Sequence, residues 1–180
     1  MEKTYDVQCE AYKKYIDNHI SNVQKCFDFY GKAICEKLKI DHDRLMSIIE
    51  DHDKSKYSEE EFEGYRSYFY PTDDEEAEKK STFGGFLKKK FDAAWLHHLR
   101  TNNHHPEFWI NFNGETGYEC NTMDRYAIAE MLLDWAAMGI TNEDTAYDYF
   151  YKSVATKPFT HETVLIIESV IEVFKEKYHD

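Results

Sequence analysis

Residues 43–56, DRLMSIIEDHDKSK, join an apolar helical run to a histidine–aspartate pair. The run holds four apolar residues with helical spacing, Leu45, Met46, Ile48 and Ile49. Asp43 can cap the start of the helix, and His52 and Asp53 follow its last apolar turn. The stretch therefore predicts a helix that carries an imidazole and a carboxylate at its C-terminal end.

Apolar residues continue in steps of three and four along most of the chain. One stripe runs from Val7 to Leu38 and predicts a long helix, with His19 beside the stripe. Further helices are expected over residues 58–69, 83–102, 123–138, 141–150 and 160–178. Few strand-like alternations occur, and only 7 Gly and 3 Pro interrupt the chain. The sequence therefore predicts an all-α fold.

Local signals give the expected ends of these helices. Ser58 followed by Glu61 is a capping-box pattern that opens the helix over residues 58–69. Gly139 can terminate the helix that precedes it, and Thr141 can start the next one.

Two stretches are expected to lie outside these helices. The charged residues 72–81, TDDEEAEKKS, have no apolar face and predict an exposed loop or a frayed helix. Residues 111–121, NFNGETGYECN, predict a loop. No internal repeat or linker separates the helices, so residues 1–180 are expected to form a single domain of six or seven packed helices.

Charge limits the partners of the chain. Its 22 Lys+Arg and 35 Asp+Glu give a net charge of -13, which repels polymeric nucleic acid and anionic membranes. A small phosphorylated substrate is compatible with this charge, because a few lysines and a bound cation reverse the field inside one pocket. The polar N-terminus and the lack of a long apolar run predict a cytoplasmic protein. Its four cysteines show no Cys-x-x-Cys pairing and are expected to be reduced.

Histidine is concentrated in two short clusters, the His-Asp pair and HHLRTNNHH at residues 97–105. Neutral imidazole and carboxylate are the usual ligands of zinc, iron and manganese. His98 and His105 are seven residues apart and can meet one metal from one side of a helix. His97 and His104 have the same spacing, so either pair can be the inner one.

Two acids lie on the otherwise apolar segment YAIAEMLLDWAAMG, residues 126–139. Glu130 and Asp134 are four residues apart and point the same way from one helix. Burying a carboxylate among leucines and tryptophan is costly unless a cation or hydrogen-bond donors compensate. A metal supplies that compensation, with Asp134 as a ligand and Glu130 as an acceptor for a ligating histidine or as a general base.

An apolar helix that ends in His-Asp, with a lysine three residues later, resembles the HD-domain superfamily of metal-dependent phosphohydrolases. The resemblance spans about residues 12–140 and implies an all-helical fold with four defining ligands, here His19, His52, Asp53 and Asp134. Lys56 occupies the place of a lysine that faces substrate phosphate. A second pair, His42 and Asp43, precedes the apolar helix instead of ending it and is rejected for this reason.

Some HD-type proteins bind two metals by adding histidines between the pair and the last aspartate. With His98 and His105 added, the resemblance implies a six-ligand set: His19, His52, Asp53, His98, His105 and Asp134. These ligands suit one or two divalent ions and do not distinguish manganese, iron, zinc, cobalt and magnesium. The motifs HDKSKYS, HHLRTNNHH and EMLLDW are also similar to a bacterial and phage family of small uncharacterised proteins, which implies no activity.

The HD resemblance implies a metal-dependent phosphohydrolase acting on a small phosphorylated compound such as a nucleotide. Asp53 would bridge metal and nucleophile, Lys54 or Lys56 would neutralise phosphate charge, and Glu130 is the third candidate for a role in the reaction. A similar His/Asp set also fits a dinuclear iron oxygenase of the HD fold. A binding or regulatory protein is the third hypothesis, and it is favoured if the six ligands fail to converge.

Overall fold

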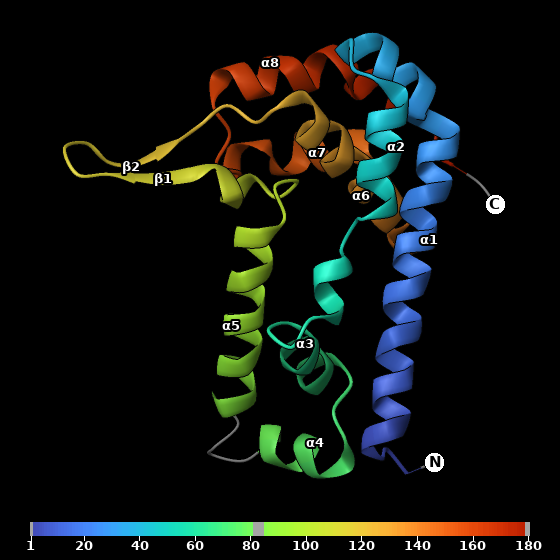
Figure 1. Cartoon of the computed structure of the whole chain (residues 1–180), viewed down its shortest axis with the longest axis vertical. Helices are drawn as coiled ribbons and strands as arrows, with labels where there is room; N and C mark the ends of the chain where they lie inside the picture. The colour runs from blue at the N-terminus through green and yellow to red at the C-terminus, as the bar shows by residue number, and fades with distance from the viewer. Residues whose placement is uncertain (1, 81–84, 179–180) are drawn as a thin grey trace. The chain divides into compact units, whose positions relative to one another are not determined.

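The computed structural model describes residues 2–80 and 85–178, most of which lie in helices (Figure 1). The α-helices of these residues are α1 (Tyr5–Leu38), α2 (His42–Glu50), α3 (Phe62–Phe69), α4 (Asp73–Lys80), α5 (Gly85–Thr101), α6 (Arg125–Asn142), α7 (Ala146–Ser153) and α8 (His161–Val170). The expected all-α class is confirmed, apart from one small hairpin. Within the described ranges, no helix combines the length and the apolar character needed to cross a membrane.

Contacts within the chain group its residues into two compact units. The first unit contains residues 1–18 and 53–102, and the second contains residues 19–52 and 103–180. Helix α1 contributes its first part to the first unit and the remainder to the second. One boundary between the units falls between His52 and Asp53, inside the His-Asp pair.

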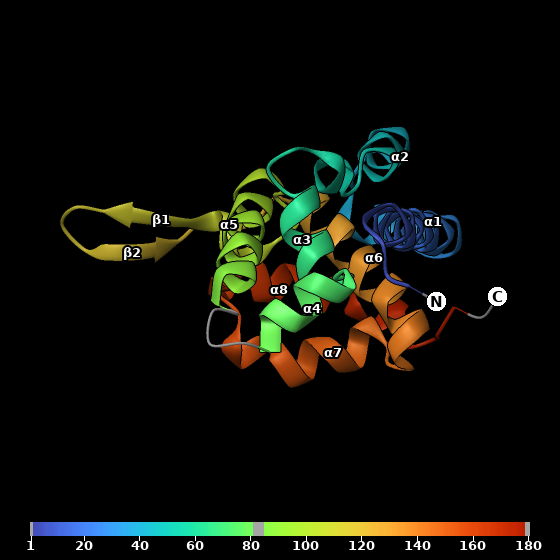
Figure 2. The ribbon, with the colours of Figure 1, turned by 90° about the horizontal axis from the view of Figure 1, so that it is seen from below.

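In the first unit, α3 packs against α5 (Figures 1 and 2). The close approach requires Gly64, because a Cβ at this position would lie 2.5 Å from the Cβ of Ala94. Aromatic rings join α3 to the first part of α1, where the Tyr12 ring lies 5.1 Å from Phe62 and 6.4 Å from Tyr65. Helix contacts and stacked rings together form the core of this unit.

Helix α5 turns Leu87, Ala94 and His98 toward the interior of the first unit. Trp95, next to Ala94 in the sequence, is exposed. The reason is that Trp95 lies about 100° around the helix from Ala94, outside the buried stripe. The predicted start of this helix at Phe83 lies outside the described residues.

Helix α4 is regular, although its sequence predicts an exposed loop or a frayed helix. Acidic residues occupy its first turn and lysines its last turn, which matches the helix dipole. Arg66 of α3 is buried and forms a two-pronged ion pair with Glu75, at 2.5 and 2.7 Å from its two carboxylate oxygens. A tertiary contact therefore stabilises a helix that has no apolar face.

In the second unit, the later part of α1 packs with α2, α6, α7 and α8 around one apolar core. Helix α6 is the most deeply buried of these elements, and its buried residues come from nearly every side: Ala127, Ile128, Ala129, Glu130, Met131, Leu132, Leu133, Ala136, Ala137 and Gly139. A helix that is apolar all round belongs in a core. The fold therefore carries the two acids of α6 into the interior of the second unit.

Two helix ends in the second unit differ from their sequence signals. Helix α2 is capped by Asp41, whose carboxylate accepts the Arg44 amide, and not by Asp43. Helix α6 continues past Gly139 and ends at Asn142. Glycine at position 139 allows close packing, since a Cβ there would lie 2.4 Å from the backbone oxygen of Asp144.

The last two helices also shift. Helix α7 begins after the cap Thr145 and not at Thr141. Helix α8 ends at Val170, and a separate 3₁₀ turn over Ile171–Phe174 follows it. The predicted helix to residue 178 is therefore too long.

The stretch predicted as a loop at residues 111–121 contains a β-hairpin, with strands β1 (Ile110–Asn113) and β2 (Gly117–Cys120). The strands are antiparallel, and Phe112 pairs with Tyr118. The hairpin projects away from helices α6, α7 and α8 of the same unit (Figures 1 and 2). Residues Ile110–Asn113 alternate apolar and polar side chains, but a run of this length is at the lower limit of a strand pattern, and all of these side chains are exposed.

Candidate metal centre

Two histidines and an aspartate of the second unit meet around one point. His19 comes from α1, His52 follows the end of α2, and Asp134 comes from α6. Asp134 Oδ1 lies 3.1 Å from His19 Nε2 and 3.8 Å from His52 Nε2, and the two Nε2 atoms are 3.4 Å apart. The structure thus brings together three of the predicted ligands as a group able to hold a metal ion.

The spacing of these three ligand atoms matches the size of a metal ion. A circle through points 3.1, 3.4 and 3.8 Å apart has a radius of about 2.0 Å, and bonds from zinc to histidine nitrogen or carboxylate oxygen measure about 2.0–2.2 Å. An ion near the centre of that circle would contact all three atoms. Imidazole nitrogen and carboxylate oxygen are ligands of several divalent metals, and this set of ligands does not identify one of them.

Glu130 holds the other side of the His52 ring. It lies one turn before Asp134 on α6, and its Oε1 lies 2.9 Å from His52 Nδ1 and 3.1 Å from His104 Nδ1. An imidazole that donates its Nδ1–H to a carboxylate keeps the Nε2 lone pair for a metal. The two acids of α6 therefore face opposite nitrogens of His52, and this geometry supports Glu130 as an acceptor for a ligating histidine.

The histidines keep both carboxylates ionised. Burial raises the pKa of Glu130, but the hydrogen bonds from His104 and His52 outweigh it and hold the pKa below its ordinary value. Burial also opposes ionisation of Asp134, and the hydrogen bond from His19 lowers the pKa of this carboxyl well below its ordinary value. A buried carboxylate, Glu130, and a partly buried one, Asp134, beside imidazoles form an environment that a cation stabilises.

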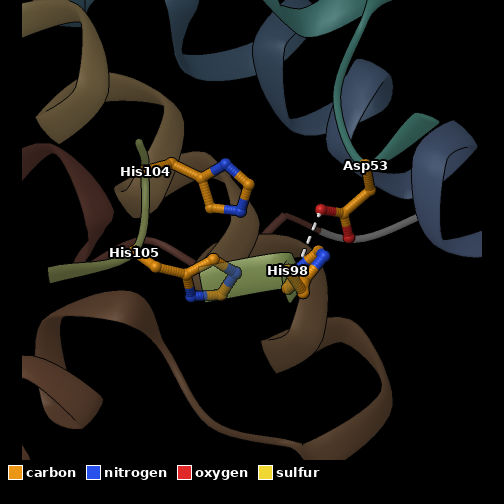
Figure 3. A group of neighbouring side chains, drawn as sticks. All are labelled: Asp53, His98, His104 and His105. Carbon is orange, nitrogen blue, oxygen red and sulfur yellow. Dashed lines mark ion pairs between the residues drawn. The ribbon is translucent and has the colours of Figure 1, made fainter. Parts of the chain in front are cut away.

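The histidines after α5 do not share one helix face. Helix α5 ends at Thr101, so the seven-residue spacing no longer aligns side chains beyond it. His104 is buried beside Glu130, with its ring 4.6 Å from that of His52. His105, the predicted ligand, lies next to His104 with ring centroids 4.3 Å apart (Figure 3). Between the two histidines at the end of the cluster, it is therefore His104 that contacts Glu130.

Asp53 and His98 form a pair in the first unit (Figure 3). His98 Nε2 lies 3.4 Å from Asp53 Oδ1, and Lys56 Nζ lies 2.5 Å from Asp53 Oδ2. Lys56 therefore neutralises the Asp53 carboxylate, while Lys54 is exposed. Asp53 has a left-handed backbone with φ of 56°, which aspartate tolerates better than most residues. Beyond this turn the contacts change: Asp53 contacts Lys56 and His98, whereas His52 contacts Glu130 and His19.

Glu61 is a site residue that sequence patterns did not reveal. Its two carboxylate oxygens accept hydrogen bonds from His97 Nδ1 at 2.8 Å and from His98 Nδ1 at 2.9 Å. The capping-box prediction is wrong, because this buried side chain binds the histidines and α3 starts without a side-chain cap. Burial raises the pKa of Glu61, but the bonds from His98 and His97 lower it overall. In the sequence, Glu61 is one of many acids and lies far from the histidine cluster at residues 97–105, so no local pattern indicates that they meet.

The rejected pair, His42 and Asp43, lies at the start of α2. Their side chains are 48% and 90% exposed, and the His42 ring packs against Phe27 at 4.9 Å. By contrast, His52 and Asp53 are buried. Sequence context therefore separates the two dipeptides as predicted.

Fold and site together define a helical protein whose buried histidines are bound to carboxylates. The family model described as "Family of unknown function (DUF5662)" matches residues 8–173, and the chain belongs to this family. The match includes every residue of the candidate metal centre. Neither a curated protein nor a solved structure matches the chain. Its function is therefore argued from the site.

Proposed function

We propose that this protein is a metal-dependent phosphohydrolase acting on a small phosphorylated compound. The observation that carries the proposal is the group of His19, His52 and Asp134, whose ligand atoms lie on a circle of about 2.0 Å radius. These residues are three of the four at which the sequence resembles the HD-domain superfamily. The fourth, Asp53, follows His52 directly in the chain.

The residues of the second unit have complementary roles in this proposal. A divalent ion bound there would polarise a phosphoryl oxygen and lower the pKa of water toward neutrality. Asp134 supplies the negative charge that favours a cation, and Glu130 keeps the Nδ1–H of His52 engaged so that Nε2 faces the centre. Both acids come from one rigid helix, which holds the ligand atoms in place.

The resemblance to HD-type phosphohydrolases assigns the charge of a phosphorylated substrate to Lys56, the lysine three residues after Asp53. A chain with a net charge of -13 repels anions unless cations lie close to the site. Lys56 is bound to Asp53, and an ammonium group with three donors can serve a phosphate oxygen as well as a carboxylate. We assign phosphate neutralisation to Lys56, with the exposed Lys54 as a weaker contributor.

The test is hydrolysis by protein loaded in turn with manganese, iron, zinc, cobalt and magnesium. Nucleotides and sugar phosphates are offered, and released inorganic phosphate is measured. Metal-dependent release is expected, with loss of activity in Asp134→Asn and normal activity in the matched control His42→Ala. If a protein shown to hold its metal releases no phosphate from any compound, the hydrolase proposal is rejected.

A dinuclear iron oxygenase is the second candidate, because each unit holds a further buried histidine, His98 and His104. Its signature is two iron ions per chain and consumption of oxygen in place of phosphate release. Metal binding with neither reaction would instead favour a binding or regulatory protein.

A further inference from the structure

His104 lies on a loop of the second unit, after the end of α5 at Thr101 and before the 3₁₀ turn Pro106–Trp109. It is nevertheless buried, with 2% of its surface exposed. Its Nδ1 lies 3.1 Å from Glu130 Oε1, the atom that also accepts the Nδ1–H of His52 at 2.9 Å. Because loops hold side chains less precisely than helices do, this contact depends on how the loop itself is fixed.

Trp109 closes this loop from the other end. Its indole Nε1–H donates a hydrogen bond to the backbone oxygen of Asn103 at 2.7 Å, so that residues 103–109 form a closed turn that contains His104. The indole ring packs against the apolar core of the second unit. The backbone oxygen of Trp109 also accepts the amide of Asn121, just after β2, at 2.8 Å. Trp109 is therefore anchored to the core and to the hairpin while it holds Asn103.

The oxygen that Trp109 holds belongs to the peptide group between Asn103 and His104. A peptide group is planar, so fixing its oxygen also orients the backbone nitrogen of His104. The direction of the His104 side chain follows from that backbone. The distance of 3.1 Å from His104 to Glu130 is near the upper end of the range for such hydrogen bonds, and a small rotation of this peptide group would break the contact.

We propose that Trp109 is a positioning residue of the metal centre: it holds His104 against Glu130 and thereby keeps Glu130 on His52. The inference rests on the metal centre of the proposed function and assigns it a further residue. Two imidazoles on one carboxylate oxygen fix the orientation of Glu130, and this carboxylate makes His52 a stronger ligand. Trp109 acts through His104 and does not bind the metal, because an indole N–H is a donor only.

The test compares Trp109→Phe, His104→Phe and the double variant with the control Phe108→Leu. Both changes to phenylalanine keep an aromatic ring and remove the nitrogen that forms the contact. Phe108 is a matched control because it lies in the same 3₁₀ turn, is 40% exposed and bonds to His105 through its backbone only. Zinc affinity is measured on the full chain by competition with a chromophoric chelator. Histidine Nδ1–H resonances, helix content and melting temperature are measured on the same proteins.

Trp109→Phe is expected to bind zinc about fivefold more weakly, the effect of one hydrogen bond between neutral groups. His104→Phe should lose at least as much affinity. The double variant should bind zinc no more weakly than His104→Phe, because both residues act along one path. The Nδ1–H resonance of His104 should disappear in Trp109→Phe, with helix content retained. Phe108→Leu should match the parent in each measurement.

Losses of zinc affinity that add in the double variant would overturn the inference, since Trp109 would then act on the fold and not through His104. Unchanged affinity in Trp109→Phe, loss of its helix content, or no zinc binding by the parent would also overturn it. Failure of the hydrolase proposal gives a different result: the expected pattern of zinc affinities, in a protein that releases no phosphate from any compound.

Discussion

Buried glutamates position the histidines in both units of this protein. In each unit one glutamate accepts hydrogen bonds from two imidazoles, Glu130 from His52 and His104, and Glu61 from His97 and His98. A histidine whose Nδ1–H is engaged in this way presents Nε2 to its other neighbour. For His52 that neighbour is Asp134, and for His98 it is Asp53.

Substituting Glu130 by glutamine tests the positioning role in the second unit. The amide keeps one acceptor oxygen but loses the charge that makes His52 a stronger ligand. Metal affinity, measured by competition with a chromophoric chelator, should fall about 10- to 100-fold with the fold retained. Glu143→Gln, at the exposed end of the same helix, should bind metal as the parent does. Equal affinity in the two variants would show that Glu130 does not position the ligand.

The structure brings together three of the predicted metal ligands, His19, His52 and Asp134, for which residue type and family resemblance agreed. Glu61 was misassigned because its bonds to histidines are distant in the chain, whereas its spacing from Ser58 has a local meaning that tertiary contacts override. A contact between distant side chains leaves no periodic trace in the sequence.

Among the elements, apolar periodicity predicted the helices that bury a face and failed for those that do not. Helix α1 follows its apolar stripe closely, and α6 is apolar on nearly every side. Helix α4 and the β1–β2 hairpin bury almost nothing, so α4 depends on its contact with Arg66 and the hairpin on its cross-strand pairs. The contacts that stabilise such elements do not appear as an apolar stripe in their sequence.

The cap of α2 provides a test at this scale. Asp41 Oδ1 accepts the backbone N–H of Arg44 at 2.8 Å, whereas the Asp43 side chain is exposed. Asp41→Ala should lower the free energy of unfolding by about 1 kcal/mol. Asp43→Ala should lower it by only about 0.3 kcal/mol, through the helix dipole. Urea unfolding measures both, and the reverse order would restore Asp43 as the cap.

The contact between α3 and α4 should make the protein sensitive to acid. The hydrogen bond from Arg66 lowers the pKa of Glu75 in the folded state, against a smaller opposing effect of burial. A folded pKa below the unfolded value gives stability that is complete above the ordinary glutamate pKa and is lost as the pH falls through the folded value.

Glu75→Gln should therefore melt at a lower temperature than the parent near neutral pH and lose less on acidification. Melting curves from neutral pH to about pH 3 measure this difference, since that range covers the titration of glutamate. Asp74→Asn, an exposed change on the same helix, should follow the parent. If the curves of Glu75→Gln and the parent run parallel, the ion pair does not contribute to acid sensitivity.

At the scale of the whole molecule, the grouping of residues into two units has no counterpart in the sequence pattern. Composition and charge do not change at the boundaries, which cut through α1 and fall between His52 and Asp53. A division of this kind arises from which surfaces pack together, and no linker precedes or follows it in the sequence. The candidate metal centre of His19, His52 and Asp134 lies entirely within the second unit.

The most direct test of the account is elemental analysis of the protein purified without added metal, with the variants His52→Ala and His42→Ala beside it. The account predicts one or two divalent transition-metal ions per chain in the parent and in His42→Ala, and almost none in His52→Ala. The melting temperature of His52→Ala should also fall, because His19 and Asp134 lose the cation that binds them. A His52→Ala protein that keeps its metal, beside a His42→Ala protein that loses it, would contradict the account and move the site to the other pair.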